Sequence, residues 1–577
     1  MQAMWIMCCK LLEKDCNKAI RSMVYSINQM KNHIKSKIHG LASLLMMTVP
    51  LTPLATAQAE QVKNEKTEKP NIVFLFSDDH ALNAISAYGG RFEKLAPTPN
   101  IDRLASEGAI FKNSFCANSI CGPSRACILS GKHSHKNGFL RNSGGKGFDQ
   151  SQWTFIKAFG KAGYQSAVIG KWHLKTKPTG FDYWEILPGQ GSYYNPDFIQ
   201  MDGKKKRFQG YVTDITTDKS LAWLDGRDKS KPFMLMCQYK APHRTFSPAL
   251  RDLNAFNGVT IPEPDSLFDD YTNRSKTLPQ NEMEIDRHLT WQYDLKLRNS
   301  EMDGVKLPNF RNYGTPEYNR MNKEQKKAWD AHFGPLNARF IADYKAGKVS
   351  HKQMVQWKYQ RYMKNYLATV KSVDENVGKV LKYLKDNDLE ENTIVIYSSD
   401  QGFYLGEHGW FDKRWMFEES FKMPFLIKWP GVIKPGSKPL AMIQNIDYAP
   451  TFLDMAGIDT PAEVQGKSIV PILKDSTKEV RDILYYAYYE LGEHRVPQHF
   501  GVRTKTHKLF YIPETEEWQM FDLVNDPEEM QCVYGKAEYK DVQADLTKRY
   551  HQVRKGLEAP TYEEFAAKKK APKKKGH

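Results

Sequence analysis

The sequence predicts an α/β fold with a large, mainly parallel central sheet flanked by helices, followed by a small antiparallel subdomain with a helix. Apolar runs typical of buried strands alternate with helical segments over residues 70–460, which is the pattern of a parallel sheet. Four of these runs end in charged or polar residues, as expected where parallel strands present a ligand site at their carboxyl ends. Over residues 480–560 the strands become short and closely spaced, which favours an antiparallel arrangement.

The elements of the larger region follow from apolar runs and from helix start and stop signals. Residues 70–77 form a continuous apolar run that ends at Asp78 and Asp79, which is typical of a buried parallel strand. Residues 98–108 carry a Pro in the first turn and end at a Gly, as a helix does. Comparable signals predict further strands at 164–169, 233–239, 393–399 and 423–428, and further helices at 153–162, 217–224, 352–386 and 447–456.

Other stretches depart from this alternation. Residues 250–345 are polar and aromatic with little periodicity, so we expect an insertion and not a separate core. A lysine-rich basic tail occupies residues 561–577. In the C-terminal subdomain we expect short strands at 484–489, 500–503, 508–512 and 519–522, closed by a helix at 542–557.

The N-terminal residues have the pattern of an export signal. Residues 30–39 are basic, residues 41–53 are apolar, and a small-X-small cleavage site ends at Ala57. We therefore assign residues 1–57 to an N-terminal extension and a secretory signal peptide, and expect an exported protein, periplasmic or secreted. Beyond the signal, no apolar window reaches the roughly eighteen residues that a membrane span needs, so no transmembrane anchor is expected.

The formal net charge of +16 is concentrated at the two ends of the chain. Residues 1–59 carry seven Lys or Arg against two acids, and the tail from Lys568 to Lys575 carries six lysines. Subtracting these +5 and +6 leaves about +5 for the folded body. A basic tail can bind nucleic acid, but the sequence has no zinc finger or other nucleic-acid module, so no nucleic-acid partner is expected.

The most informative motif is Cys121-Gly-Pro-Ser-Arg125, which leads into the apolar run 126–131. The pattern indicates a loop that enters the first turn of a helix, where free backbone N–H groups and the helix dipole favour an anion. Arg125 adds a permanently charged guanidinium next to the cysteine. A buried structural cysteine beside a helix cap is the alternative interpretation.

Acids and an amide follow two of the predicted strands. Asp78 and Asp79 follow the first strand, and Asp400 and Gln401 follow the strand at 393–399. Oxygen ligands suit a hard cation such as Ca²⁺ or Mg²⁺ better than they suit zinc. Either pair alone would fit a turn or a helix cap equally well. Because neighbouring parallel strands end at one edge of the sheet, the two pairs are expected to meet there.

The run from Cys121 to Gly131 resembles the signature of the type I sulfatases of the alkaline phosphatase superfamily. The resemblance implies an alkaline-phosphatase-like catalytic domain over residues 70–460. It also implies that a formylglycine-generating maturation enzyme oxidises Cys121 to Cα-formylglycine (3-oxoalanine), whose hydrate is the nucleophile for sulfate esters. Five cysteines follow residue 57, an odd number for an exported protein, and this conversion would leave four.

The same resemblance implies a metal site and a set of catalytic side chains. Lys171 would hold the aldehyde-derived group, His173 would act on it, His243 would lie near the leaving-group oxygen, and Lys413 would bind sulfate together with Arg125. The alternatives for each residue alone are a salt-bridged surface lysine and a satisfied core histidine. The residues implied to bind Ca²⁺ or Mg²⁺ are Asp78, Asp79, Asp400 and Gln401, with the oxygen at residue 121.

Within that family, several short runs resemble the N-acetylglucosamine-6-O-sulfatases. These runs are Ser77-Asp-Asp-His-Ala81, Pro99-Asn-Ile-Asp102, Gly180-Phe-Asp-Tyr183 and Asp412-Lys-Arg414. The implied substrate is a sulfated glycan, such as heparan sulfate, keratan sulfate or a mucin glycan, and the implied reaction is 6-O-desulfation of N-acetylglucosamine. Asp412 and Arg414 would contact sugar hydroxyls, with His499 as a third candidate.

Other functions remain open on the sequence. One group comprises other sulfatase specificities, namely glucosamine N-sulfatase, uronate 2-O-sulfatase and arylsulfatase. Another is a phosphonate monoester or phosphodiester hydrolase, because relatives reuse the cysteine motif and the metal site. A third is a catalytically silent glycan-binding protein, against which the complete set of motif residues argues.

Overall fold

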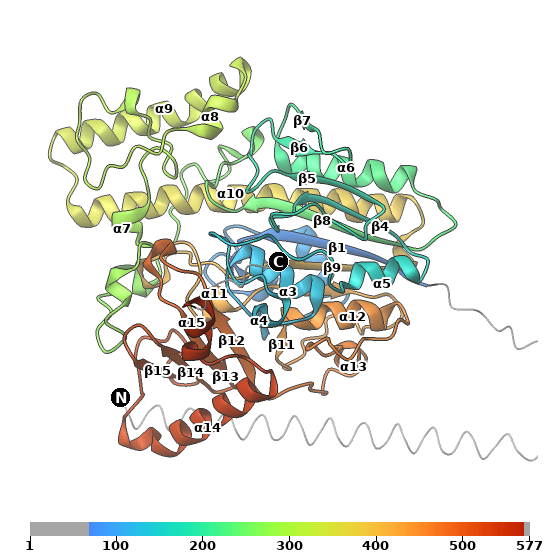
Figure 1. Ribbon diagram of the computed structural model, residues 1–577. Coiled ribbons are helices and arrows are strands. Elements are labelled where there is room, and N and C mark those ends of the chain that lie inside the picture. Colours follow the sequence, from blue (N-terminus) through green and yellow to red (C-terminus); the bar gives the residue numbers. More distant parts are fainter. Residues whose placement is uncertain (1–68, 571–577) are drawn as a thin grey trace, which may run out of the picture. The chain divides into compact units, whose positions relative to one another are not determined.

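The structure is a computed structural model that describes residues 69–570 (Figure 1). The predicted extension and signal peptide, residues 1–57, lie outside the described residues, as does the last part of the basic tail. The described part contains a large nine-stranded sheet and a separate four-stranded sheet near the C-terminus. Among residues 69–570, none of the helices combines the length and the apolarity that crossing a membrane requires.

The five central strands of the large sheet are parallel, as predicted, and its outer strands are antiparallel. Phe74 of the first strand lies opposite Met236 on one side and Ile396 on the other. The sequence did not indicate these antiparallel edges, whose pairing does not require a helical crossover. The strand order is β2 (Ala109–Ile110), β10 (Phe425–Lys428), β9 (Thr393–Ser399), β1 (Asn71–Asp78), β8 (Phe233–Pro242), β4 (Gln165–Lys171), β5 (Tyr183–Leu187), β6 (Asp197–Ile199) and β7 (Lys205–Arg207).

Helices cover both faces of this sheet, and alternate side chains of β1 divide between two apolar cores. Ile72, Phe74 and Phe76 pack with the helices α5 (Phe155–Lys161) and α12 (Tyr448–Met455). Val73 and Leu75 pack on the opposite face with α10 (His351–Asp386), the long helix predicted from its amphipathic pattern. Burial on both faces explains why the central strands read as continuous apolar runs.

The insertion contains a long helix that the sequence did not reveal. Helix α9 (Lys323–Lys345) lies within the stretch 250–345, where we expected little regular structure. Its start is marked by a capping box in which Asn322 accepts from the backbone N–H of Gln325. That signal was present in the sequence, but the helix lacks a clear apolar stripe, because most of its residues are exposed or half-buried.

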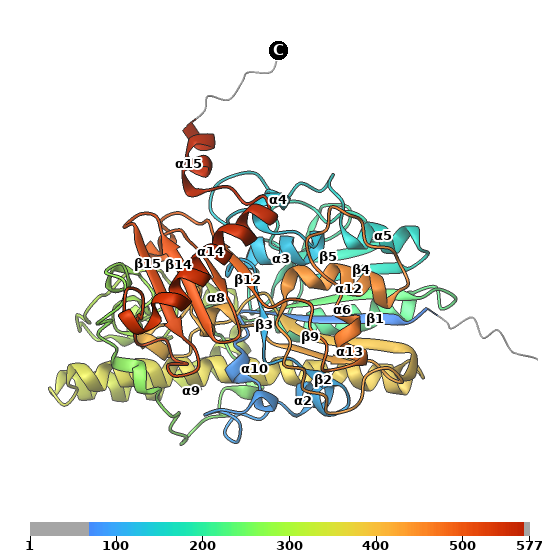
Figure 2. The ribbon, with the colours of Figure 1, turned by 90° about the horizontal axis from the view of Figure 1, so that it is seen from below.

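The C-terminal subdomain is the predicted antiparallel sheet, with α14 (Lys540–Gly556) packed on one face (Figure 2). Its other face packs against the segment that precedes α11 (Glu418–Phe421). The approach is close, because a Cβ on Gly501 would lie 2.7 Å from the sulfur of Met416. The strands are β12 (Leu484–Tyr488), β13 (His499–Arg503), β14 (His507–Ile512) and β15 (Glu517–Asp522), paired in that order.

Candidate functional site

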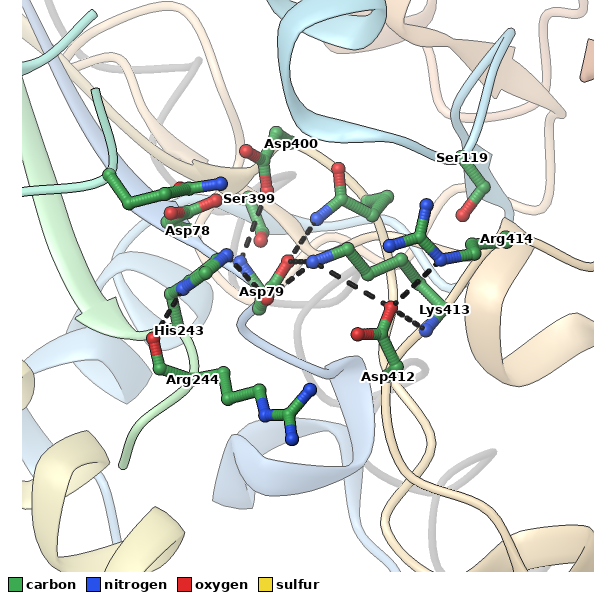
Figure 3. Close-up of polar contacts among 12 residues, drawn as sticks. Asp78, Asp79, Ser119, His243, Arg244, Ser399, Asp400, Asp412, Lys413 and Arg414 are labelled. Carbon is green, nitrogen blue, oxygen red and sulfur yellow. Dashed lines mark hydrogen bonds and ion pairs between the residues drawn. The ribbon is translucent and has the colours of Figure 1, made fainter. Parts of the chain in front are cut away.

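The four polar strand ends singled out in the sequence lie at one edge of the sheet. Their strands are consecutive neighbours in the order β9, β1, β8, β4, and all are parallel. Figure 3 shows Asp79 between Asp400, His243 and Lys413, with Asp412 and Arg414 beyond the lysine. The carboxyl edge of the sheet is therefore the candidate active site, as predicted.

Cys121 is the first residue of helix α3 (Cys121–Ser130), which ends at Gly131 in a left-handed conformation with φ 63°. Its side chain is buried, with a relative exposure of 1%. Burial raises the pKa of the Cys121 thiol to about 12, so the unmodified residue stays a neutral thiol near pH 7. An unmodified Cys121 is consequently a poor nucleophile, despite its place at a helix N-terminus.

Asp79 is the centre of the site's hydrogen-bond network. Lys413 Nζ donates to both of its carboxylate oxygens, at 2.7 and 2.6 Å, and Gln401 Nε2 donates to one of them. The backbone N–H of Asp79 donates to Asp400 Oδ1 at 3.1 Å. Burial raises the pKa of Asp79 to about 7, against the lowering effect of Lys413. The φ of 62° at Asp79 marks the turn that brings both acids to the strand end.

Arg125 joins the helix to three strand ends. Its guanidinium donates to Asp400 Oδ2 at 3.0 Å, to the carbonyl of Lys171 at 2.7 Å and to Gln238 Oε1 at 3.0 Å. The ammonium of Lys171 in turn contacts Asp78 Oδ2. Both cations are buried, so their charges act through a medium of low dielectric constant.

The donor set of this cluster fits a hard cation. Ligand atoms of Asp78, Asp79, Cys121 and His243 lie within 4.8 Å of one another. The amide oxygen of Gln401 is buried without a hydrogen-bond partner, and the carboxylate oxygens of Asp78 are buried next to Lys171 and Arg125. Buried oxygens at the convergence of several acids are the ligands that Ca²⁺ or Mg²⁺ requires. The cluster includes three of the residues implied as ligands and adds His243, which sequence reasoning had not connected with the metal.

The two predicted catalytic histidines flank the acids. His243 Nε2 lies 3.6 Å from Asp79 Oδ2, and its Nδ1 donates to the carbonyl of Arg244 at 2.6 Å. His173 follows β4 in a left-handed conformation with φ 57°, and its Nδ1 is buried without a hydrogen-bond partner. Burial is the main cause, and the nearby charge of Lys171 the second, that lowers the pKa of both histidine rings well below the usual range.

The segment carrying Lys413 brings two more charged residues to the site. Asp412 and Arg414 have φ values of 80° and 101°, which turn their side chains to the same side as Lys413. Arg414 Nε lies 3.4 Å from Asp412 Oδ1, and its Nη1 donates to the hydroxyl of Tyr488 at 3.3 Å. Although burial raises it, the charges of Lys413 and Arg414 hold the pKa of Asp412 below its usual range. Asp412 is therefore an anionic hydrogen-bond acceptor next to Lys413.

The structure brings a different histidine to Asp412 from the one named in the sequence. His494 Nε2 lies 3.5 Å from Asp412 Oδ2, and its Nδ1 donates to the carbonyl of Glu282 at 2.9 Å. His499 is fully buried and packs on the ring of Trp415 at 4.9 Å. The assignment of His499 to the sugar stays a prediction, and the geometry favours His494 for that position. No motif marked His494, because only the folded loop before β13 carries it to Asp412.

Two family models match the chain. The model described as sulfatase covers residues 70–458, and the model described as N-sulphoglucosamine sulphohydrolase, C-terminal, covers residues 406–556. The chain belongs to the sulfatase family. It is a sulfuric ester hydrolase, and the resemblance drawn from the cysteine motif is confirmed.

Curated relatives and solved structures agree with this assignment. An N-acetylglucosamine-6-O-sulfatase of Bacteroides thetaiotaomicron is 46% identical over 88% of this chain and 90% of its own length. The human N-acetylglucosamine-6-sulfatase is 26% identical over 71% of this chain and 65% of its own. A solved structure with D-glucosamine-2-N,6-O-disulfate as its substrate is 46% identical, with a TM-score of 0.79 over 85% of this chain and 98% of its own.

A phosphonate monoester hydrolase of Agrobacterium radiobacter shares the fold of this sulfatase. Its TM-score is 0.57, over 85% of this chain and 96% of its own, at 17% identity. At that identity the likeness concerns the fold alone.

Proposed function

We propose that this sulfatase removes the 6-O-sulfate of N-acetylglucosamine residues in sulfated glycans, such as heparan sulfate, keratan sulfate or mucin glycans. The observation that carries the proposal is the 46% identity with an N-acetylglucosamine-6-O-sulfatase over most of both chains. The buried Asp412–Lys413–Arg414 segment supports it, because it holds a carboxylate and a guanidinium, groups that can bind sugar hydroxyls, beside the lysine proposed to bind sulfate.

The nucleophile in this proposal comes from Cys121, after a formylglycine-generating maturation enzyme has oxidised it to Cα-formylglycine. Residue 121 would then present a hydrated aldehyde to the sulfur atom, which a thiol with a pKa of about 12 cannot replace at neutral pH. Residue 121 lies where the dipole of α3 favours negative charge.

The cations of the site neutralise the sulfate group. Arg125, Lys171 and Lys413 are all buried around the cluster of acids, where Lys171 and Lys413 pair with Asp78 and Asp79. Buried cations at this position would stabilise the charge that develops as the S–O bond breaks. Lys171 would also orient the oxygens at residue 121.

The histidines move protons. His243 faces the acids through Nε2, the atom that would protonate the departing sugar oxygen. His173, which follows β4, would remove the proton from the second hydroxyl at residue 121 when sulfate is expelled.

Asp78, Asp79, Asp400 and Gln401, with the oxygen at residue 121, would hold one Ca²⁺ or Mg²⁺. The ion would supply positive charge next to the sulfate and favour the ionised form of the nucleophile. Lys413 and Lys171, which pair with the two acids in this structure, would turn toward the sulfate oxygens.

Recognition of the sugar falls to Asp412, Arg414 and His494. A buried carboxylate and a buried guanidinium can bind neighbouring ring hydroxyls in a fixed geometry. His499 would support this segment indirectly, because its ring stacks on Trp415, the residue that follows Arg414.

We also propose that residues 1–57 direct export to the periplasm or the medium, where the glycan substrate is met. Localisation of the full chain and N-terminal sequencing of the exported form would test this, with cleavage after Ala57 expected.

The deciding experiment is an activity screen with protein matured in a native host. Release of sulfate from N-acetylglucosamine 6-sulfate, and not from uronate 2-O-sulfate, is expected. The match of residues 406–556 to the N-sulphoglucosamine sulphohydrolase C-terminal model keeps glucosamine N-sulfate as the competing substrate. Faster release from N-sulfate than from 6-O-sulfate of glucosamine-2-N,6-O-disulfate would overturn the proposal.

A further inference from the structure

Lys240 is a buried ammonium group beside the active site that none of the roles above uses. It lies on β8, three residues before His243, with a relative exposure of 2%. Among the described residues, no carboxylate lies within ion-pair distance of its Nζ. Burial lowers the pKa of Lys240 to about 8, although the more distant charges of Glu317 and Asp79 raise it. A buried cation without a direct ion-pair partner carries a desolvation cost that an apolar side chain of the same length would avoid. Its position therefore calls for a local purpose.

The polar contact of Lys240 is to the carbonyl that orients His243. Lys240 Nζ lies 3.4 Å from the carbonyl oxygen of Arg244, and His243 Nδ1 lies 2.6 Å from the same oxygen. Because a carbonyl only accepts, Nδ1 carries a proton and Nε2 is left to face the reacting atoms. The position of this one oxygen thus decides both the tautomer and the direction of the ring.

Tyr193 holds the other side of the same turn. Its hydroxyl donates to the carbonyl of His243 at 2.5 Å, and its ring lies 4.7 Å beneath the Nζ of Lys240. The side chain of Glu317, from the insertion, accepts from the backbone N–H of Tyr193 at 2.9 Å. The insertion thereby supports the turn that carries His243, through Glu317 and Tyr193.

We propose that Lys240 and Tyr193 are positioning residues that hold His243 in the orientation needed to protonate the leaving oxygen. Lys240 acts on the carbonyl of Arg244, and Tyr193 acts on the carbonyl of His243. The inference rests on the proposed role of His243 as the general acid.

The step that depends on this orientation is the cleavage of the ester. As the S–O bond breaks, its electron pair stays on the sugar oxygen, which takes the Nε2 proton from His243 once the ring has been protonated in the presence of the anionic substrate, whose charge favours the imidazolium. The ring is left as the neutral Nδ1–H tautomer, the form that the carbonyl of Arg244 stabilises. A sugar alkoxide is a poor leaving group and needs this proton, whereas a nitrophenolate needs it far less.

The test compares leaving groups in the matured enzyme. Lys240→Met keeps the length of the side chain and removes its charge and donors. We expect kcat/KM on N-acetylglucosamine 6-sulfate to fall about 10- to 100-fold, part of the 10²- to 10⁴-fold effect of general acid catalysis. On 4-nitrophenyl sulfate the loss should stay within about threefold. His243→Ala should show the same split with larger losses.

A double mutant separates positioning from direct substrate binding. If Lys240 acts through His243, then Lys240→Met combined with His243→Ala should be no slower than His243→Ala alone. Additive losses, or equal losses of Lys240→Met on both leaving groups, would overturn the proposal. Tyr193→Phe should also lower kcat/KM more on N-acetylglucosamine 6-sulfate than on 4-nitrophenyl sulfate, by a smaller factor than Lys240→Met. This second variant provides the test if Lys240→Met does not fold.

Two matched variants control for general effects of altering this region. Lys358 is also buried, donates to the carbonyl of Asp286 and lies 4.4 Å from the ring of Trp291, so Lys358→Met removes a comparable buried ammonium away from the turn of His243. Tyr211 stacks near Tyr193 but donates to the carbonyl of Ser247 at 2.9 Å. Neither Lys358→Met nor Tyr211→Phe should change the ratio of rates on the two leaving groups.

A failure of the proposed 6-O-sulfatase function can be distinguished from a failure of the inference about Lys240. In that case the wild-type enzyme itself would not desulfate N-acetylglucosamine 6-sulfate. A series of aryl sulfates whose phenols differ in acidity would then test Lys240 without the sugar. Lys240→Met should steepen the dependence of kcat/KM on phenol acidity, and an unchanged slope would contradict the inference.

Discussion

Lys413 donates to both carboxylate oxygens of Asp79, at 2.7 and 2.6 Å, although the two residues are far apart in the sequence. This contact joins the segment that carries the proposed sugar-binding residues to the strand end that carries the acids. Because the flanking residues Asp412 and Arg414 lie on the same segment, the proposed sugar contacts would be held at a fixed position relative to the proposed sulfate contact of Lys413.

The first prediction concerns the nucleophile. In protein from a native host, the tryptic peptide that contains residue 121 should have a lower mass than its cysteine form, by the change from thiol to aldehyde. Cys121→Ala should lower turnover at least about a thousandfold, because no neighbouring side chain can replace the nucleophile. Its effect on the free energy of unfolding should be only about 1 kcal/mol, since one small side chain is removed. Full activity of Cys121→Ala would refute the role of residue 121.

The second prediction concerns the metal. Chelation should abolish activity, and added Ca²⁺ or Mg²⁺ should restore it. Asp400→Asn should lower kcat about 100-fold or more, because the amide keeps the size of the side chain and removes the ligand charge. Asp386→Asn is the matched control, since Asp386 is an exposed acid paired with Lys382. Elemental analysis of active protein that finds zinc alone, or no metal, would exclude the oxygen-ligand site.

The third prediction concerns substrate recognition. Asp412→Ala should lower kcat/KM on N-acetylglucosamine 6-sulfate by about 10- to 100-fold, because it removes a buried acceptor for a sugar hydroxyl. On a simple aryl sulfate, which offers no such hydroxyl, the loss should stay within about threefold. If Asp412 served only as an ion-pair partner of Arg414, both substrates would be affected alike. Steady-state kinetics on the two substrates distinguishes these outcomes.

The fourth prediction concerns stability and pH. His408 is fully buried, with Nδ1 3.2 Å from Asp269 and Nε2 3.7 Å from Glu419. Burial alone would lower its pKa, but the contacts with Asp269 and Glu419 outweigh burial and raise the pKa of His408 to about 9. Because the pKa is higher in the folded protein than in the unfolded chain, this stabilisation is full below about pH 6.5 and is lost as pH rises through about 9.

His408→Asn is the variant that tests this contribution. Asn tolerates the left-handed backbone of residue 408, where φ is 56°, but it cannot carry the charge. We expect the variant to be less stable by about 3 kcal/mol at pH 6 and the difference from wild type to shrink between pH 7 and 9. Denaturant unfolding at several pH values measures it. A difference that is constant over this range would show that His408 is neutral in the folded protein.

Local sequence patterns were sufficient where the evidence lies within a few residues. The apolar run 70–77, the helix signals around α10 and the motif from Cys121 to Arg125 depend on neighbours along the chain, and the structure reproduces the elements that they predict. The gathering of four polar strand ends at one edge also followed from local patterns, because the carboxyl ends of neighbouring parallel strands share an edge.

Local patterns failed where burial depends on distant partners. Helix α9 has no continuous apolar stripe, because it contributes only scattered residues such as Trp329 and Phe340 to cores made with other segments. The antiparallel edge strands are too short for their direction to be read from periodicity.

The sequence by itself determined the family, the central sheet and the identity of the acids, lysines and histidines that line its carboxyl edge. Only the tertiary structure decided which of them meet. It placed His494 next to Asp412, buried His499 against Trp415, and set Lys240 and Tyr193 around the turn of His243. The physical reason is that these contacts join segments that are distant in the sequence and are brought together by burial of apolar surface and by backbone turns. The polar residues that meet in this way show no periodic pattern in the sequence.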